Sequence, residues 1–196
     1  MIYKQFEAAL ICSVISLAAS AQTIETNITY TNSISGADNR FIVYAAKQNL
    51  AITNFEGKPD INNDAVAITS SGFLFKAGFR NKNGKAILNI LVDCSFDKQL
   101  SWMKDKGKNE YILSHEQHHF DISYISTLLF IKKLKQASLT VDNYKDQLQT
   151  IYNNAINNME QLQSKYDIET SNGLLKDKQE IWNNKINQQL ASLISE

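Results

Sequence analysis

The amino-acid sequence predicts an α+β fold in which a small, mostly antiparallel sheet comes first and three long helices follow. In the first half, from Thr23 to about Phe96, short β-branched runs are separated by turn residues, as in strands. In the second half, from about Lys108, apolar residues recur at spacings of three and four, as on helices. The chain has 196 residues, 43% of them hydrophobic, which is enough for one domain with its own core.

Five segments of the first half have the alternating or β-branched pattern of strands. They are residues 23–31, 50–55, 65–69, 73–79 and 86–92. Residues 81–84 contain Asn and Gly and are typical of the tight turn of a hairpin, which would join the last two segments. We therefore expect a small sheet with mainly antiparallel pairs.

Three helices are expected in the second half. Residues 111–135 contain neither Gly nor Pro, and residues 139–165 carry apolar side chains every three or four positions. Thr140 is a candidate N-cap for the second of these helices. The pattern breaks at residues 166–173, where we expect a loop, and a third helix follows with Trp182 and Ile186 on its apolar stripe.

The N-terminal segment has the features of a signal peptide. Lys4 precedes an apolar run from Ala8 to Ala18, and the small residues of Ala19-Ser20-Ala21 form a suitable cleavage site. The run is shorter than the ~20 apolar residues that a membrane span needs. We therefore expect residues 1–21 to be a signal peptide and residues 22–196 to be a single exported domain, periplasmic or secreted, with no membrane insertion after cleavage.

Charge and cysteine content narrow the possible partners and the possible sources of stability. Twenty basic and twenty acidic residues give a net charge of zero, which offers no basis for binding nucleic acid. After signal cleavage Cys94 is the single remaining cysteine, so no intramolecular disulfide can form. We expect Cys94 to be a buried, unreactive thiol. Nothing in the sequence indicates an oligomeric state.

The three histidines of the chain all fall in the segment His115-Glu116-Gln117-His118-His119. His115 and His119 are four residues apart, which on a helix places them on the same face, one turn apart. Two imidazole nitrogens at that spacing can occupy two positions of a tetrahedral zinc site. A polar helix face that happens to carry histidines is the alternative interpretation.

Glu116 follows the first histidine, as in the HExxH pattern of zinc hydrolases. In that pattern the carboxylate acts as general base on a metal-bound water, whose pKa the zinc lowers towards neutrality. The apolar residues on both sides have helical spacing, which is the setting that the motif requires. We therefore expect a zincin-like motif helix with Zn²⁺ as cofactor, His115 and His119 as metal ligands, and Glu116 as the catalytic base.

The residues around the motif resemble the HEQGHFDI signature of a bacterial family of secreted zinc-dependent proteases, domain of unknown function 922. The resemblance extends over most of the chain after the signal peptide. Its second specific part is residues 166–173 (Y-D-x-E-T-x-H-G). Its weaker parts are residues 50–59 (L-x-W-x-D-F-x-G), 65–69 (A-x-T), 101–102 (S-W), and Gln179 with Trp182 (Q-x-x-W). It implies a zinc-dependent hydrolytic site with His115, His119 and Glu116 in the roles given above.

Two positions depart from that family pattern, which has Gly in place of His118 and His in place of Asn172. A catalytic zinc needs a third protein ligand, and the family's downstream histidine is a candidate that this chain lacks. Glu169 in the predicted loop is our preferred substitute, and Asp167 in the same loop, Asp121 and Asn172 are the alternatives. Because Asp121 lies on another face of the motif helix, we expect it to orient a histidine instead.

Tyr166 is a candidate hydrogen-bond donor to a tetrahedral oxyanion near the metal, and packing in the core is the alternative. Together these features predict a secreted zinc-dependent hydrolase, a metallopeptidase acting on a peptide or protein substrate. The main alternative is a catalytically inactive envelope binding module that has lost its third metal ligand. A further alternative is a protein that holds zinc without turnover.

Overall fold

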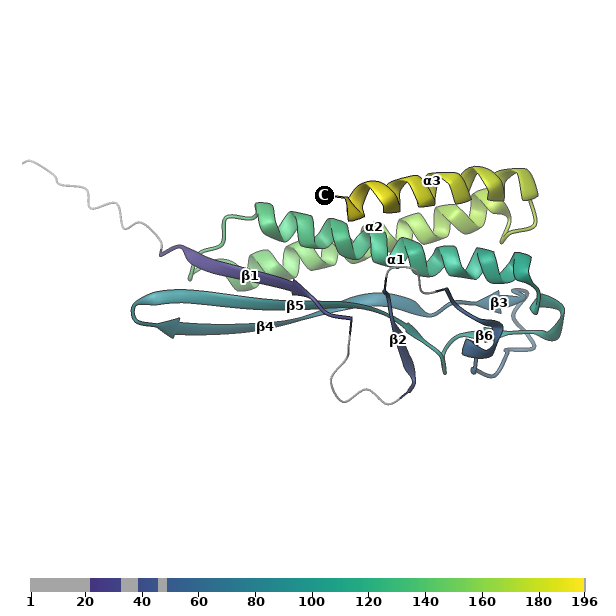
Figure 1. The fold of residues 1–196 in the computed structure, drawn as a ribbon, viewed down its shortest axis with the longest axis horizontal. Helices are drawn as coiled ribbons and strands as arrows, with labels where there is room; N and C mark the ends of the chain where they lie inside the picture. The colour runs from purple at the N-terminus through teal and green to yellow at the C-terminus, as the bar shows by residue number, and fades with distance from the viewer. Residues whose placement is uncertain (1–21, 33–38, 46–48, 196) are drawn as a thin grey trace, which may run out of the picture.

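The computed structural model describes residues 22–32, 39–45 and 49–195, and it confirms the predicted α+β fold. A sheet forms one layer, and three long helices cover one face of it (Figure 1). The predicted signal peptide, residues 1–21, lies outside the described residues, so export remains a prediction. Within the described ranges, no helix combines the length and the hydropathy needed to cross a membrane.

Strand β5 (Lys85–Asp97) is the centre of the main sheet. Strand β4 (Ser71–Lys82) pairs with it antiparallel along its whole length, which confirms the predicted hairpin. Asn83 and Gly84 form the turn with φ of 53° and 75°, a left-handed conformation that Asn and Gly tolerate best. The other edge of β5 pairs with β1 (Ile24–Tyr30) in parallel and with β2 (Phe41–Val43) antiparallel.

Two parts of the strand prediction were wrong. Residues 50–55 form no strand, because Ile52–Asn54 is a short 3₁₀ helix (η1) in which the Asn54 side chain accepts a hydrogen bond from the Ala51 amide. Such a local bond offers the backbone an alternative to sheet pairing. In the segment 65–69 only Ala67–Ile68 (β3) is a strand, and it pairs with β6 (Trp102–Met103), which was not predicted, in a separate two-stranded sheet.

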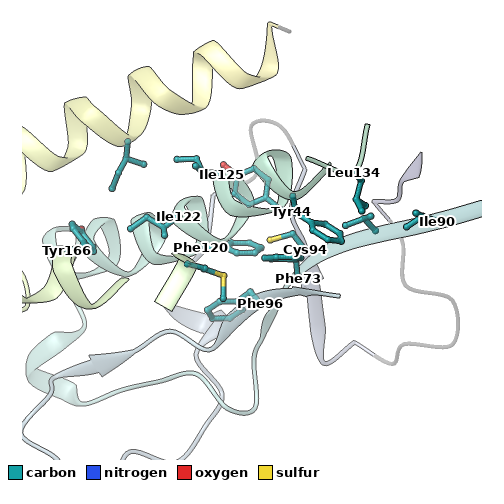
Figure 2. Packing of buried hydrophobic residues seen from close by; sticks show 14 of the residues in the cluster. Tyr44, Phe73, Ile90, Cys94, Phe96, Phe120, Ile122, Ile125, Leu134 and Tyr166 are labelled. Carbon is teal, nitrogen blue, oxygen red and sulfur yellow. The ribbon is translucent and has the colours of Figure 1, made fainter. Parts of the chain in front are cut away.

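The hydrophobic core lies between β5 and helix α1 (Glu110–Gln136). Every second residue of β5 points inward, and the side chains at 88, 90, 92, 94 and 96 are at most 1% exposed. They pack against apolar residues of α1, as Figure 2 shows for Phe120, Ile122, Ile125 and Leu134. Cys94 is fully buried as predicted, and this burial raises the pKa of its thiol.

Helices α2 (Tyr144–Thr170) and α3 (Lys176–Ile194) both pack on α1. Helix α2 also contacts the sheet, since the ring of Tyr152 packs on Phe73 and Phe75 of β4, whereas α3 lies on the side of the helical layer away from the strands (Figure 1). Thr140 does not cap α2, since it forms a β-bridge with Thr23 before the helix begins. The predicted loop at 166–173 was also wrong: α2 continues to Thr170 and ends at Ser171, which has a left-handed φ of 51°. Residues 144–172 contain neither Gly nor Pro, so no helix-breaking residue ends α2 earlier.

Candidate metal centre

Three side chains from two helices bring together atoms that can bind a metal, at one end of the helical layer. We call these three residues the donor group. His115 and His119 project from α1, with 3.2 Å between their Nε2 atoms. Asp167 projects from the last turn of α2, and its Oδ1 lies 2.9 Å from Nε2 of His119 and 3.2 Å from Nε2 of His115. Three ligand atoms this close together can hold a metal ion.

The connection between the helices explains why residues so far apart in sequence meet here. Only residues 137–143 separate α1 from α2, so the two helices pack as antiparallel neighbours. The start of α1, which carries the histidines, therefore lies beside the end of α2, which carries Asp167. The helical spacing predicted from the sequence thus places His115 and His119 on one face, as expected.

Asp167, and not the preferred Glu169, completes this group of donors. Residues two apart on a helix point about 200° away from each other, so only one of the two carboxylates can face α1. The carboxylate of Glu169 instead accepts a hydrogen bond from Nε1 of Trp182 at 2.9 Å and lies 3.7 Å from Nζ of Lys165. The sequence prediction treated these residues as loop, where both carboxylates would have been free to turn inward.

The other two candidates for a third ligand take different positions. Asn172 lines the cavity beside the donors, in the left-handed turn that follows α2. Asp121 lies on another face of α1, where its carboxylate lies 2.8 Å from Nδ1 of His118 and accepts a hydrogen bond from the hydroxyl of Tyr44 at 2.9 Å. Asp121 does orient a histidine, but that histidine is His118 and not a member of the donor group.

Glu116 lies next to the donors on the wall of a cavity of about 390 Å³. The residue is only 4% exposed, and the accessible part of it lines this cavity. Its backbone carbonyl accepts a hydrogen bond from the hydroxyl of Thr69, which ties the motif helix to the β3 segment. The opposite walls of the cavity come from residues 65–69 and from α2.

Tyr166 packs behind the donors and does not face the cavity. Its ring stacks on the imidazole of His115, with 4.6 Å between centroids and 19° between planes. Its hydroxyl donates to the backbone carbonyl of His115 at 3.3 Å and lies 2.5 Å from Nε2 of Gln179. The side chain is fully buried, and burial raises the pKa of its phenol. The predicted contact with an oxyanion would need an exposed hydroxyl, which this arrangement does not offer.

The turn after α2 closes over His115. Gly173 has φ of +80°, and a Cβ at this position would lie 3.2 Å from the imidazole ring of His115. Its carbonyl accepts a hydrogen bond from the hydroxyl of Tyr111 at 2.5 Å. Glycine is therefore required here both by the backbone conformation and by the close approach to a donor residue.

Two glutamines that the sequence did not single out as site residues contact the far nitrogens of the histidines. Oε1 of Gln179 lies 2.8 Å from Nδ1 of His115, and Oε1 of Gln163 lies 2.5 Å from Nδ1 of His119. Gln163 is one helical turn before Asp167 on the same face of α2. If α2 had been predicted to continue through residue 167, this spacing would have indicated Gln163 as a residue of the site.

The charges at the site influence one another strongly. Burial alone would raise the pKa of Asp167, but hydrogen bonds from His115 and His119 hold it well below its usual range. Burial alone would lower the pKa of His119, but the hydrogen bond to Asp167 and the negative charges of Glu116 and Asp167 raise it overall. The site therefore attracts positive charge, which a proton or a metal cation can supply.

No family model, no curated protein and no solved structure matches this chain. The resemblance noted in the sequence therefore remains a prediction. What is known of the site rests on its own geometry, which is that of a cluster able to hold a metal ion beside a buried carboxylate and a cavity.

Proposed function

We propose that this protein is a zinc-dependent hydrolase of peptide or other amide bonds, a metallopeptidase of the HExxH type. The observation that carries the proposal is the juxtaposition of the three donors with Glu116 at a common cavity. A largely buried carboxylate is costly to maintain in its charged form, so its presence on the wall of this cavity favours a chemical role. The proposal also fits the HExxH spacing of the sequence.

The donor set suits zinc. His115, His119 and Asp167 would hold the ion through two nitrogens and one oxygen, and three protein ligands leave a catalytic zinc one open position. A bound zinc ion would supply Lewis-acid activation of water and of the substrate carbonyl. The same donors also accept other divalent ions, so the choice of zinc is part of the proposal.

Glu116 is the proposed general base. Its carboxylate can accept a proton from the attacking water and deliver it to the amide nitrogen that leaves. The negligible exposure of Glu116 keeps bulk water from competing for this carboxylate. Tyr166 stacks on His115 and donates a hydrogen bond to its backbone carbonyl, so it would hold His115 in place and would not contact the substrate.

The β3 segment favours an extended peptide as substrate over a small amide. Val66 directs its carbonyl towards β6, where it accepts a hydrogen bond from the amide of Lys104 at 2.8 Å. Because backbone groups alternate along a strand, the amide and carbonyl of Ala67 point away from β6. Residues 65–69 form one wall of the cavity, so an extended chain can pair with this strand while its carbonyl reaches the donors.

The inactive binding module is the weaker alternative. Its main support was the missing family histidine, and Asp167 now supplies a third donor from the last turn of α2. The intact Glu116 likewise has no purpose in a module that only binds. A protein that stores zinc without turnover remains the competing outcome of the experiment below.

Zinc content and peptide hydrolysis test the proposal together. We expect purified protein to contain about one zinc ion per chain by elemental mass spectrometry. We expect it to hydrolyse unstructured peptides, and Glu116→Gln to lose hydrolysis while retaining its zinc. Failure to bind zinc when the ion is supplied would contradict the proposal, as would equal hydrolysis by Glu116→Gln. Zinc without hydrolysis of any peptide would favour the storage alternative.

A further inference from the structure

We propose that Gln163 and Gln179 are positioning residues that fix both metal-binding histidines in one tautomer, with the proton on Nδ1 and the lone pair of Nε2 directed at the metal. The inference rests on the proposed metal site but not on hydrolysis. It follows from the order of donors and acceptors around each amide. The other hydrogen-bond partners of each glutamine determine whether its amide oxygen or its amide nitrogen faces the histidine.

Gln163 shows this order most clearly. Its Nε2 lies 2.9 Å from the backbone carbonyl of His119 and 3.2 Å from the hydroxyl oxygen of Ser123. A carbonyl can only accept, so the atom that faces it must be the amide nitrogen. The amide oxygen then faces Nδ1 of His119 at 2.5 Å and can itself only accept. Nδ1 of His119 must therefore carry a proton.

Gln179 imposes the same tautomer on His115 through a different set of contacts. The hydroxyl of Tyr166 donates to the carbonyl of His115, so it accepts a hydrogen bond from Nε2 of Gln179 at 2.5 Å. A second contact joins Nε2 of Gln179 to Oδ1 of Asn183 at 2.6 Å. The oxygen of Gln179 is left for Nδ1 of His115 at 2.8 Å. Because Gln179 is 2% exposed, solvent offers no alternative arrangement.

The two amides thus leave three acceptors facing one another. In the neutral imidazoles both Nε2 atoms carry lone pairs, and they lie within 3.2 Å of each other and of the carboxylate oxygen of Asp167. Such an arrangement is repulsive until a cation lies between the acceptors. The glutamines therefore hold the site in the form that a metal requires, since no proton has to move from Nε2 to Nδ1 first. Being uncharged, they also add no negative charge to the metal site.

Imidazole nitrogen NMR and zinc affinity test this assignment. In metal-free protein at about pH 9, well above the usual pKa of histidine, His115 and His119 should show a protonated Nδ1 and a bare Nε2. Gln163→Met and Gln179→Met remove the acceptor while keeping the size of the side chain. We expect them to give mixed tautomers and to weaken zinc binding by ~10- to 100-fold in a chelator competition.

Matched controls separate positioning from general damage. Gln161→Met and Gln188→Met change exposed glutamines on the same helices and should leave zinc affinity and tautomers as in the parent. Gln163→Glu and Gln179→Glu keep an acceptor for Nδ1, so they should keep the proton on Nδ1 even if a Met variant folds poorly. The assignment is overturned if the parent carries its protons on Nε2, or if the Met variants bind zinc like their controls. Absence of zinc binding in the parent would count against the proposed function, while the metal-free NMR would still decide the tautomer.

Discussion

Helix α1 presents histidines on two neighbouring faces, with His118 about 100° around the helix from His119, and the polar atoms of the two faces have different partners. On the α2 side, three atoms that can bind a metal converge: Nε2 of His115, Nε2 of His119 and the carboxylate of Asp167. On the other side, the carboxylate of Asp121 is met by donors. Nδ1 of His118 lies 2.8 Å from one oxygen, and the hydroxyl of Tyr44 reaches the other at 2.9 Å.

The difference distinguishes a candidate metal site from a structural histidine–carboxylate pair. A third donor, Nε2 of Gln117, also reaches the Asp121 carboxylate at 2.9 Å, so the polar atoms on that side are satisfied within the protein. On the α2 side, in the tautomer proposed above, all three converging atoms are hydrogen-bond acceptors and none donates to another. Several acceptors that face one another without a hydrogen-bond donor indicate a cation site. A histidine beside an aspartate does not indicate one by itself.

The largest expected effect is the loss of zinc from Asp167→Asn, which keeps the shape of the side chain but removes its charge. We expect zinc affinity to fall by at least ~100-fold, beyond the range typical of residues that only support a ligand. Glu169→Gln is the matched control two residues away, and it should bind zinc like the parent because it faces Trp182. Isothermal titration with zinc measures both, and the reverse order of effects would restore Glu169 as the ligand.

The second effect concerns the satisfied side of α1. Asp121→Ala leaves the hydroxyl of Tyr44 and the nitrogens of His118 and Gln117 without their acceptor in a buried setting. We expect the free energy of unfolding of metal-free protein to fall by about 3 kcal/mol, measured by urea denaturation. Variants that retain a fold should still take up zinc, because Asp121 does not contact the donor group. Loss of zinc from folded Asp121→Ala would remove the distinction between the two sides.

The sequence was sufficient for the parts of this site that depend on local spacing. His115, Glu116 and His119 lie on one helix, so their relative positions follow from the helical repeat alone. The β4–β5 hairpin and the three helices were predicted for the same reason, since strong patterns and a short Asn-Gly turn specify them locally. Strands β2 and β6 are too short for any pattern, and their partners are remote in sequence.

The third donor could not be predicted, because it depends on where α2 ends. A helix that stops at residue 165 leaves Asp167 and Glu169 in a loop with equal access to the histidines. A helix that continues to Thr170 turns Asp167 inward and Glu169 outward. The end of α2 is set by the left-handed residues Ser171 to Gly173 and by the packing of Gly173 on His115, a contact between segments far apart in sequence.

A smaller effect is expected from the matched pair His118→Leu and His119→Leu, which make the same change on neighbouring faces of α1. His118→Leu removes one of the donors to Asp121 and should lower the free energy of unfolding by about 1–2 kcal/mol, with zinc content unchanged. His119→Leu should abolish zinc binding. If both variants lose zinc, His118 belongs to the metal site and the two sides are not distinct.

The smallest expected effect is a dependence of metal-free stability on pH that arises from the α2 side. The pKa of Asp167 is lowered by folding, so its contribution is present above the usual aspartate pKa of about 4 and is lost as the pH falls further. The pKa of His119 is raised, so its contribution is complete below the usual histidine pKa of about 6.5 and is lost as the pH rises through the raised value. Both contributions are therefore present between about pH 4 and pH 6.5.

Metal-free parent and Asp167→Asn should differ most in unfolding free energy within that window, and the difference should shrink above it. Because the Asp167 side chain is 37% exposed, solvent screens the pair and we expect a difference of about 1 kcal/mol or less. Zinc and the proton compete for Nε2 of His119, so zinc affinity should rise over the same pH range in which this stability is lost. Urea denaturation from pH 4 to pH 9 with and without zinc measures both trends. A pH-independent zinc affinity would mean that the proton and the metal do not share this site, and the surplus of acceptors would then need another explanation.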